Sequence, residues 1–542
     1  MSVPPSHPDP AGGDYNAAMS EDCDRLPGET VLRRLFVLTV FTLAALPSLT
    51  SAALDTVIVD GGRISGTVAS GVRVFKGIPF AAPPVGELRW RGPQPVVPWT
   101  GVRMGDAFGA TCIQEPFPEG SPYASSGVTK DAPGSEDCLY LNVWTAAAVG
   151  AVEKSRPVMV WIHGGNWTRG SGNLPDVAAF VRKGVVLVSA NYRLGVLGFL
   201  AHPELSAESA RRASGNYAIL DQIAALQWVQ RNIHAFGGDP SRVTVFGESA
   251  GSLSVNVVQA TPLAKGLFHR AIGESGALFA STASAMATTE SEGVAFAKAA
   301  GAESLRALRG TPAEKVLATP FRTGVNIDGY VLPDTVRNLF EEKKHHLVPV
   351  LVGSNADEWT TLGNPSQYPK TMEAYRQRVE GQYGTAVKAY DAAYPVRSAA
   401  DIAKTLLAVG RDNTFTLEMR TWARMVTAAG RPAFLYQFTR VPPGPNPAWG
   451  AYHAAEIEYV LNVVGARPWA AGLDRRLAQQ MSSYWVNFAT TGDPNGKGLP
   501  KWTRYDPAAE PYLELGDAVQ GKNHLLKAQL DFLEGFQQRR QP

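Results

Sequence analysis

The chain lacks several features that would point to other classes of protein. Its 51 Lys and Arg residues nearly balance 49 Asp and Glu residues, which leaves a net charge of +2. A protein without an excess of one charge has no general electrostatic attraction to nucleic acid or to acidic membranes. There are only three cysteines and nine histidines, and neither set has the spacing of a metal site. We therefore expect no nucleic-acid partner and no metal.

A long hydrophobic run is also missing near the N-terminus, where the apolar segment covers only residues 35–46. Two arginines precede this segment and small residues follow it at 48–53, which is the order found in a secretory signal peptide. Residues 1–30 are rich in Pro, Gly and Asp, and we expect them to be disordered. We therefore predict a disordered N-terminus with a signal peptide over 1–53, a folded domain over 54–542, and a secreted or periplasmic protein. The alternative is an uncleaved signal anchor, but we expect no stable membrane insertion.

The few cysteines agree with export. Cys23 lies in the predicted leader, so Cys112 and Cys138 are the pair left in the folded domain. A single pair in a secreted domain predicts one disulfide, closing a loop of about 25 residues and worth on the order of 3 kcal/mol through loop entropy. The alternative is two unrelated buried thiols.

Hydrophobic residues make up 45% of the sequence, which is enough for a large core. Short apolar runs bounded by Gly and Pro predict strands, and runs with helical spacing alternate with them. The expected strands are 57–59, 63–68, 72–75, 139–144, 157–162, 185–191, 243–246, 348–352 and 434–438; the expected helical segments are 221–232, 281–318, 371–427 and 473–489. This alternation predicts an α/β fold with a mostly parallel central sheet, helices on both faces and helical insertions that cap a site.

The most informative segment is Gly-Glu-Ser-Ala-Gly at 247–251, which directly follows the strand expected at 243–246. Glycines on both sides let the backbone turn sharply, so that the Ser249 hydroxyl projects at the carboxyl end of a strand. A G-x-S-x-G sequence alone can be an ordinary turn. Between a strand and a helix-forming stretch it is typical of the nucleophile elbow of a serine hydrolase.

A serine hydroxyl needs a general base, usually a histidine oriented by a carboxylate. In folds with this elbow, the chain order is serine, acid, histidine, so the base should follow Ser249. His345 and His346 stand in a charged run that we expect to be a solvated face, and His524 falls in what we expect to be the last helix. His453 follows a strand and a loop, and by elimination it is the best candidate.

The acid should follow a strand between the serine and the histidine. The strand expected at 348–352 leads to Asp357 and Glu358, and spacing alone does not choose between them. The carboxylate that is not catalytic should cap a loop or stay on the surface. Upstream, His-Gly-Gly-Asn at 163–166 follows the strand expected at 157–162. In serine hydrolases, a loop of this kind after an early strand supplies backbone N–H groups that stabilise the oxyanion.

Several longer motifs occur in one order, and with them the chain resembles the type-B carboxylesterase/lipase family, in its cholinesterase-like branch. They are Phe-Lys-Gly-Ile-Pro at 75–79, Leu-Arg-Trp at 88–90, Ser-Glu-Asp-Cys-Leu-Tyr-Leu-Asn at 135–142, Asn-Tyr-Arg-Leu-Gly at 191–195 and the block 216–251. The likeness extends from about residue 57 to the C-terminus. It implies an α/β-hydrolase fold.

The resemblance also implies roles for single residues. It selects Glu358 rather than Asp357 as the acid and His453 as the base of Ser249. The oxyanion N–H groups would belong to Gly165, Asn166 and Ala250.

Two further pairs are implied by the same resemblance. Cys112 and Cys138 would form the first disulfide of the family, and Arg89 and Glu136 would form its buried ion pair.

The chain departs from the family at three places. Asn166 stands where many members have glycine; its N–H remains, but its Cβ narrows the approach. Trp359 replaces the glycine that usually follows the acid. The loop 112–138 has no tryptophan, so the cation–π floor that holds choline in the cholinesterases is missing there, and choline esters are not expected as substrates.

The resulting prediction is a carboxylesterase that works on small-molecule esters through an acyl-enzyme and needs no cofactor. The main alternative is an amide or carbamate hydrolase with the same triad. A binding protein that has lost the triad is a further alternative, which the presence of every element disfavours. The sequence makes no prediction about oligomeric state.

Overall fold

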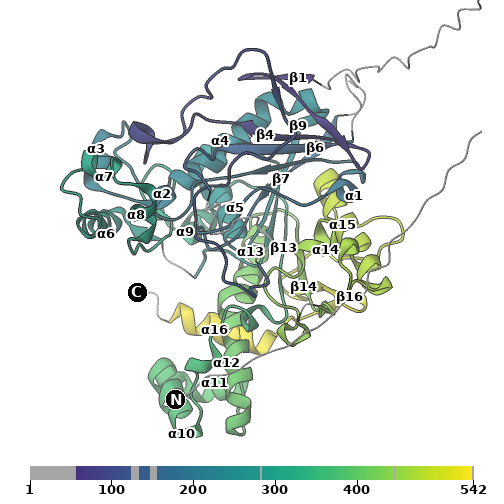
Figure 1. Cartoon of the computed structure of the whole chain (residues 1–542). Coiled ribbons are helices and arrows are strands. Elements are labelled where there is room, and N and C mark those ends of the chain that lie inside the picture. Colours follow the sequence, from purple (N-terminus) through teal and green to yellow (C-terminus); the bar gives the residue numbers. More distant parts are fainter. Residues whose placement is uncertain (1–55, 124–133, 147–154, 281–282, 445, 540–542) are drawn as a thin grey trace, which may run out of the picture. The chain divides into compact units, whose positions relative to one another are not determined.

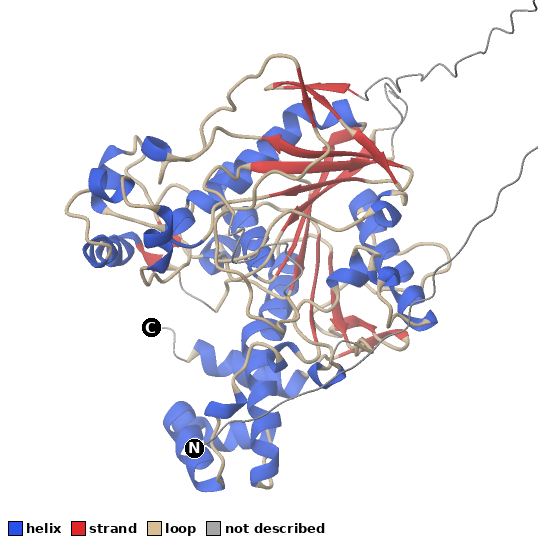
Figure 2. Cartoon of the chain, in the orientation of Figure 1, coloured by secondary structure: helices blue, strands red, loops and turns tan. Residues whose placement is uncertain are grey.

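The fold is known from a computed structural model, which describes residues 56–123, 134–146, 155–280, 283–444 and 446–539. The predictions made for residues 1–53 lie outside the described residues. Figure 1 shows strands running through the middle of the folded part with helices on both sides of them, and Figure 2 shows the same arrangement coloured by type of element. The predicted α/β class is therefore confirmed.

The central sheet has eleven described strands. In spatial order these are β16 (Val519–Asn523), β15 (Pro511–Leu515), β14 (Ala433–Phe438), β13 (Val350–Asn355), β10 (Arg270–Glu274), β9 (Gly238–Glu248), β7 (Arg156–Ile162), β8 (Val186–Ala190), β6 (Tyr140–Thr145), β4 (Val72–Pro79) and β3 (Thr67–Ala69). The neighbours from β15 to β8 pair in parallel, whereas the pairs at both ends of the sheet are antiparallel. The middle of the sheet is thus the parallel part, as the alternation of strands and helices predicts.

The described α-helices cover the sheet or extend from it. They are α1 (Ala178–Val181), α2 (Gly195–Phe199), α3 (Pro203–Glu208), α4 (Tyr217–Asn232), α5 (Ala250–Ala260), α6 (Met286–Ala299), α7 (Leu305–Arg309), α8 (Ala313–Ala318), α9 (Val336–Glu341), α10 (Met372–Tyr383), α11 (Val387–Ala393), α12 (Ile402–Arg411), α13 (Leu417–Ala428), α14 (Ile457–Val460), α15 (Gly472–Thr491) and α16 (Lys527–Gln538). None of the helices in the described ranges is long and apolar enough to cross a membrane.

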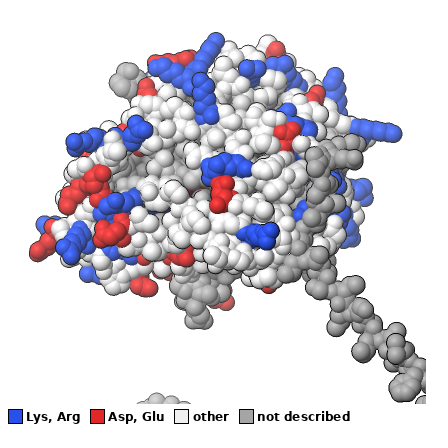
Figure 3. Space-filling model, turned by 90° about the horizontal axis from the view of Figure 1, so that it is seen from above, with Lys and Arg blue, Asp and Glu red and all other residues white. Residues whose placement is uncertain are grey.

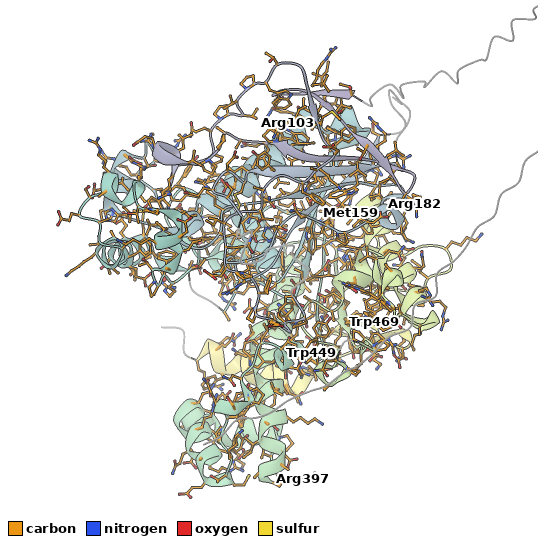
Figure 4. All side chains as sticks on the ribbon, in the orientation of Figure 1. Arg103, Met159, Arg182, Arg397, Trp449 and Trp469 are labelled. Atoms are coloured by element: carbon orange, nitrogen blue, oxygen red, sulfur yellow. A yellow bond between two sulfur atoms is a disulfide. The ribbon has the colours of Figure 1, made fainter. Side chains whose placement is uncertain are left out.

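Strand β7 shows why both faces of the sheet are covered. Successive side chains of a strand point to opposite faces. Val158, Val160 and Ile162 belong to one apolar cluster, to which α4, α5 and α13 contribute. Met159, labelled in Figure 4, and Trp161 belong to the other, to which α1, α14 and α15 contribute. A strand buried on both faces appears in the sequence as a continuous apolar run, which is what residues 157–162 are.

Smaller elements lie outside the central sheet. β1 (Thr56–Val59), β2 (Gly62–Ser65) and β5 (Val102–Met104) form a three-stranded sheet, and β11 (Ser284–Ala285) pairs with β12 (Asn326–Ile327). Helices α10, α11, α12 and α16 share an apolar cluster of their own. This cluster contains much of the helix-rich segment predicted at 371–427.

Most predicted elements occur, and the differences have physical causes. The strand expected at 63–68 is divided into β2 and β3 at Gly66, where an added Cβ would lie 2.7 Å from the Phe75 ring. His524 was expected inside the last helix, which is wrong: it has φ +60° and precedes α16, which begins at Lys527. Strands β10, β15 and β16 are not among the predicted elements.

Candidate active site

Ser249 stands at the sharp turn between β9 and α5, with φ 55° and ψ −123°. This is a strained conformation for a residue other than glycine. The flanking glycines allow β7 to approach: a Cβ on Gly247 would lie 2.6 Å from the Ile162 carbonyl oxygen, and a Cβ on Gly251 would collide with the same atom. The turn is therefore possible only with glycine at both positions, as the motif predicts.

His453 and Glu358 come together from two other strand ends. Glu358 begins the short 3₁₀ helix η5 (Glu358–Thr360) after β13, and His453 lies in the loop after β14. His453 Nδ1 is 2.6 Å from Glu358 Oε2. The other oxygen of this fully buried carboxylate accepts hydrogen bonds from the Asn355 N–H at 2.7 Å and the Ser275 hydroxyl at 2.6 Å. The carboxylate is thus fixed on both sides and holds the imidazole in one orientation.

Asp357 makes different contacts from its neighbour. Its carboxylate accepts the Ala451 N–H at 2.8 Å, and its own N–H donates to the Ala451 carbonyl at 3.0 Å. Trp449, labelled in Figure 4, is in the turn η10 (Pro447–Trp449) that begins the same loop. Asp357 therefore caps the loop that carries His453, the role expected for whichever carboxylate did not face the histidine.

Aromatic side chains enclose the imidazole of His453. Phe415 stacks on it with ring centroids 4.9 Å apart, and the Tyr123 ring stands edge-on at 6.2 Å. Phe415 belongs to a π-helical turn, η9 (Asp412–Thr416), and such turns often occur at functional sites. The Tyr123 hydroxyl is 2.7 Å from the Thr361 hydroxyl, which ties the disulfide-closed loop to the acid loop. Neither aromatic residue was predicted, because no local motif marks them.

The second ring nitrogen of His453 faces another carboxylate. Its Nε2 atom is 3.2 Å from Glu248 Oε1, and the hydrogen bonds of the described residues do not join it to Ser249. Burial, with the charges of Glu358 and Glu274, raises the pKa of Glu248 well above its ordinary value. Because Nδ1 faces a carboxylate oxygen, Nδ1 carries the proton and Nε2 is an acceptor. A neutral Glu248 can donate to Nε2 in the free protein.

Two further buried carboxylates lie near this site. Glu274 ends β10 and accepts the Trp485 indole N–H at 2.8 Å; burial raises its pKa to about 8. Glu456 accepts a hydrogen bond from the Asn355 amide, and burial together with the charge of Glu248 raises its pKa. Motif analysis does not single them out because burial alone makes them unusual.

The loop before α1 turns back on itself next to the serine. Gly165, Asn166 and Trp167 all have positive φ, at +98°, +56° and +56°. A Cβ on Gly165 would collide with the Arg169 carbonyl, so glycine is required there. The Trp167 indole donates to the Ser254 hydroxyl at 2.8 Å, which anchors the loop to α5.

This loop leaves backbone donors free beside the serine. A Cβ on Gly164 would lie 3.1 Å from Ser249 Cβ, so the loop is in contact with the elbow. Within the described part of the chain, no hydrogen bond uses the N–H groups of Gly165, Asn166 or Ala250. Unpaired N–H groups next to a nucleophile can stabilise an oxyanion.

His163 supports the loop but is not one of the residues with a free N–H group beside the serine. Its ring is buried and stacks on Tyr192 at 4.2 Å, and the Tyr192 hydroxyl donates to the His163 carbonyl at 2.6 Å. Burial lowers the pKa of His163 to about 4, which keeps the ring neutral near pH 7.

The remaining residues singled out in the sequence also meet. Cys112 and Cys138 form a disulfide with their Cα atoms 4.9 Å apart. Arg89 Nε donates to Glu136 Oε2 at 2.7 Å, and the same guanidinium donates to two backbone carbonyls. The pair ties the disulfide-closed loop to the segment after α7.

The other histidines do not join the site. His345 was expected on a solvated face, which is wrong: only 4% of it is exposed and it stacks on Phe340 at 3.9 Å. His346 Nε2 donates to the Thr261 carbonyl at 2.8 Å. Across the described ranges, no group of three or more His, Cys, Asp or Glu residues is placed to hold a metal ion.

Comparison with known proteins agrees with this arrangement. The profile that describes the carboxylesterase family matches residues 53–533. The chain is 38% identical over 475 residues to fumonisin B1 esterase of Sphingopyxis macrogoltabida, with 83% of this chain and 84% of that protein covered. It is 34% identical over 520 residues to carboxylesterase 1D of Rattus norvegicus, with 86% and 89% covered.

A solved structure has a similar fold. The crystal structure of a carboxylesterase of Geobacillus stearothermophilus at pH 6.2 superposes with a TM-score of 0.76 at 33% sequence identity. The superposition covers 88% of this chain and 100% of that one.

Proposed function

The chain belongs to the carboxylesterase family and is a carboxylic ester hydrolase, and we propose that Ser249, His453 and Glu358 are its catalytic triad. The observation that carries this proposal is the 2.6 Å contact between His453 Nδ1 and Glu358 Oε2 behind a strained serine elbow. A hydroxyl, an imidazole and a buried carboxylate in this order are the groups that acyl transfer requires.

Acylation begins when the Ser249 hydroxyl attacks the ester carbonyl while His453 Nε2 accepts its proton. Glu358 stabilises the imidazolium that forms. The negative charge on the former carbonyl oxygen is held by the N–H groups of Gly165, Asn166 and Ala250. Loss of one such donor typically costs about 10²–10³ in rate.

The tetrahedral intermediate then collapses: His453 gives its proton to the leaving oxygen, the bond between that oxygen and the carbonyl carbon breaks, and the alcohol departs. Water attacks the acyl group on Ser249 while His453 accepts a proton from it. The bond between the acyl carbon and Ser249 Oγ then breaks, His453 returns the proton to Oγ, and the acid leaves. For these steps the Ser249 hydroxyl replaces Glu248 as the partner of His453 Nε2. Such hydrogen bonds are often loose in free enzymes and tighten when substrate binds.

The proposal is tested by comparing wild type with Ser249→Ala on p-nitrophenyl butyrate. Ser241→Ala is a matched control, because Ser241 is exposed on the same strand and its hydroxyl donates to Asp239 Oδ1. We expect hydrolysis to fall to the uncatalysed rate in Ser249→Ala and to stay unchanged in Ser241→Ala. A folded Ser249→Ala protein with near wild-type turnover would overturn the assignment.

The same proposal includes export. The segment 1–53 would act as a secretory leader, the chain from 54 onward would form the catalytic domain, and the protein would be secreted or periplasmic. The order of charged, apolar and small residues in 33–53 supports this, and so does the Cys112–Cys138 disulfide, because such bonds persist in oxidising compartments. Mass spectrometry of the mature N-terminus tests it: a start close to residue 54 is expected, and a mature chain that begins near Met1 would contradict it.

A further inference from the structure

The structure contains a groove that the proposed triad does not line. It has a volume of about 450 Å³, within the range of about 300–1,000 Å³ typical of small-molecule sites. Its walls come from the segment after the 3₁₀ helix η1 (Gly86–Leu88), the loop between α3 and α4, one side of α4, and residues 328–331. None of Ser249, Glu358, His453 or the three oxyanion residues lines it.

The apolar part of the lining is called the floor of the groove here. Four of its residues, Leu220 and Ala224 of α4 with Leu263 and Tyr330, are hydrophobic side chains that are only partly buried. Ile223 and Val331 complete the floor and are almost fully buried. A groove with this lining can remove an aliphatic chain from water.

The carboxylates that line the groove already have partners within the protein. Glu208 forms a two-pronged ion pair with Arg309, with one of the two distances 2.9 Å. Asp328 is buried; one oxygen accepts three backbone N–H groups and the other accepts the Asn216 amide. Arg309 therefore offsets the charge of Glu208, and hydrogen bonds within the protein occupy both oxygens of Asp328.

Two arginines at the rim keep their charge available. Arg91 is 45% exposed in its side chain and reaches Glu208, which is already paired, only at 3.4 Å. Arg211 lies over the Tyr330 ring at 5.2 Å, and in the described part of the chain it has no ion pair with a carboxylate. Figure 3 shows that the face seen from above carries both signs of charge among uncharged residues.

From this combination we infer a second binding site for an amphipathic carboxylate, an organic anion with an aliphatic tail. The carboxylate lies between Arg91 and Arg211, and the tail lies along α4 over Leu220 and Ala224. No histidine or cysteine is among the residues that line the groove, so the site binds its ligand without converting it. The inference does not depend on the triad assignment.

The site is tested by titration calorimetry with octanoate, with octan-1-ol and butanoate as comparison ligands. We expect octanoate to bind with one site per chain and each added methylene to strengthen binding by up to about fourfold. The double substitution Arg91→Gln/Arg211→Gln should lower the affinity for octanoate by about tenfold or more and change the affinity for octan-1-ol little. Ala224→Trp, which fills the groove, should weaken both. Hydrolysis of a short ester should be unchanged in all variants.

A second arm separates this groove from the active site. Octanoate is titrated into protein whose Ser249 carries a diethyl phosphate group, verified by peptide mass. Binding that survives the block supports the groove, and binding that disappears overturns it. Equal octanoate affinity in wild type and in the arginine double variant also overturns the proposal. If Ala224→Trp does not fold, the arginine double variant still provides the test, because it alters only exposed side chains at the rim. If Ser249 does not take up the diethyl phosphate group, that result counts against the proposed function. The octanoate affinities of the groove variants then decide whether the groove binds a carboxylate.

Discussion

Two adjacent carboxylates, Asp357 and Glu358, have different partners and should respond differently to loss of charge. Glu358→Gln removes the charge that stabilises the imidazolium of His453, so kcat should fall by about 10⁴-fold. Asp357→Asn keeps an oxygen for the Ala451 N–H, so kcat should stay within about tenfold of wild type. Steady-state kinetics on p-nitrophenyl butyrate measures both. Equal losses in the two variants would show that the acid is not Glu358.

Glu274 gives a prediction about stability and pH. Burial raises its pKa to about 8 from an ordinary 4.5, so between these values the native state holds a proton that the unfolded state has lost. Its contribution to the free energy of unfolding is full below pH 4.5 and is lost as pH rises towards 8, by up to about 1.4 kcal/mol per pH unit. Glu274→Gln removes this dependence and keeps an acceptor for the Trp485 N–H.

Urea unfolding at pH 5 and pH 8 checks the prediction. Glu274→Gln should gain stability relative to wild type as pH rises. Glu303→Gln is the control, because Glu303 is exposed, and its stability relative to wild type should not change with pH. A difference between Glu274→Gln and wild type that is the same at both pH values would refute the argument.

At the residue scale, the sequence predicts what local patterns encode. Ser249 is marked by its glycines, and His453 by its place after a strand. The residues alone left Asp357 and Glu358 equivalent, because the choice depends on how a loop folds over β13. Tyr123, Phe415 and Glu274 could not be predicted, since each matters through burial and distant contacts.

At the scale of elements, the α12 helix is fitted closely to Trp359, the residue that replaces a family glycine. A Cβ on Gly410 of α12 would lie 2.5 Å from the Trp359 indole nitrogen. Gly410→Ala should therefore destabilise the protein by about 1–3 kcal/mol through overpacking. Gly381 of α10 has open space around its Cβ position, so Gly381→Ala should stabilise by about 0.4–1 kcal/mol.

Denaturant unfolding of the two glycine variants measures this difference. Because Trp359 also packs on Phe415, which stacks on His453, Gly410→Ala should lower kcat more than Gly381→Ala does. The close fit of α12 to Trp359 is refuted if both substitutions change the free energy of unfolding in the same direction.

The disulfide-closed loop is a second element with a testable role. Replacing Cys112 and Cys138 together with serine should lower the free energy of unfolding by about 3 kcal/mol, because the unfolded chain gains the freedom of a loop of 26 residues. The same loop carries Tyr123 to His453, so KM should rise as well. Unfolding and kinetics under non-reducing conditions test this, and a double variant as stable as wild type would contradict it.

The elements that the sequence predicts are those with continuous apolar runs or clear helical spacing, such as β7, β9 and α4. Strands β10, β15 and β16 were not predicted, because their sequences are short or polar and their pairing partners are distant in the chain. His524 was misplaced because the last helix begins only at Lys527, after a residue with positive φ.

At the scale of the whole molecule, the parallel middle of the sheet determines where the chemistry lies. Ser249, Glu358 and His453 follow β9, β13 and β14, and the carboxyl ends of parallel strands share one edge of a sheet. The sequence predicted this architecture because strands and helices alternate. It could not predict the groove beside α4, because the walls of that groove are joined only by the tertiary fold.

The central claim is that one serine, Ser249, carries the acyl group. The most direct measurement is peptide mapping of the protein after reaction with diethyl p-nitrophenyl phosphate, with residual esterase activity followed in parallel. We predict one diethyl phosphate group per chain, located on Ser249, and loss of activity in proportion to labelling. Full activity after labelling of Ser249, or inactivation with the label on another residue, would contradict the account.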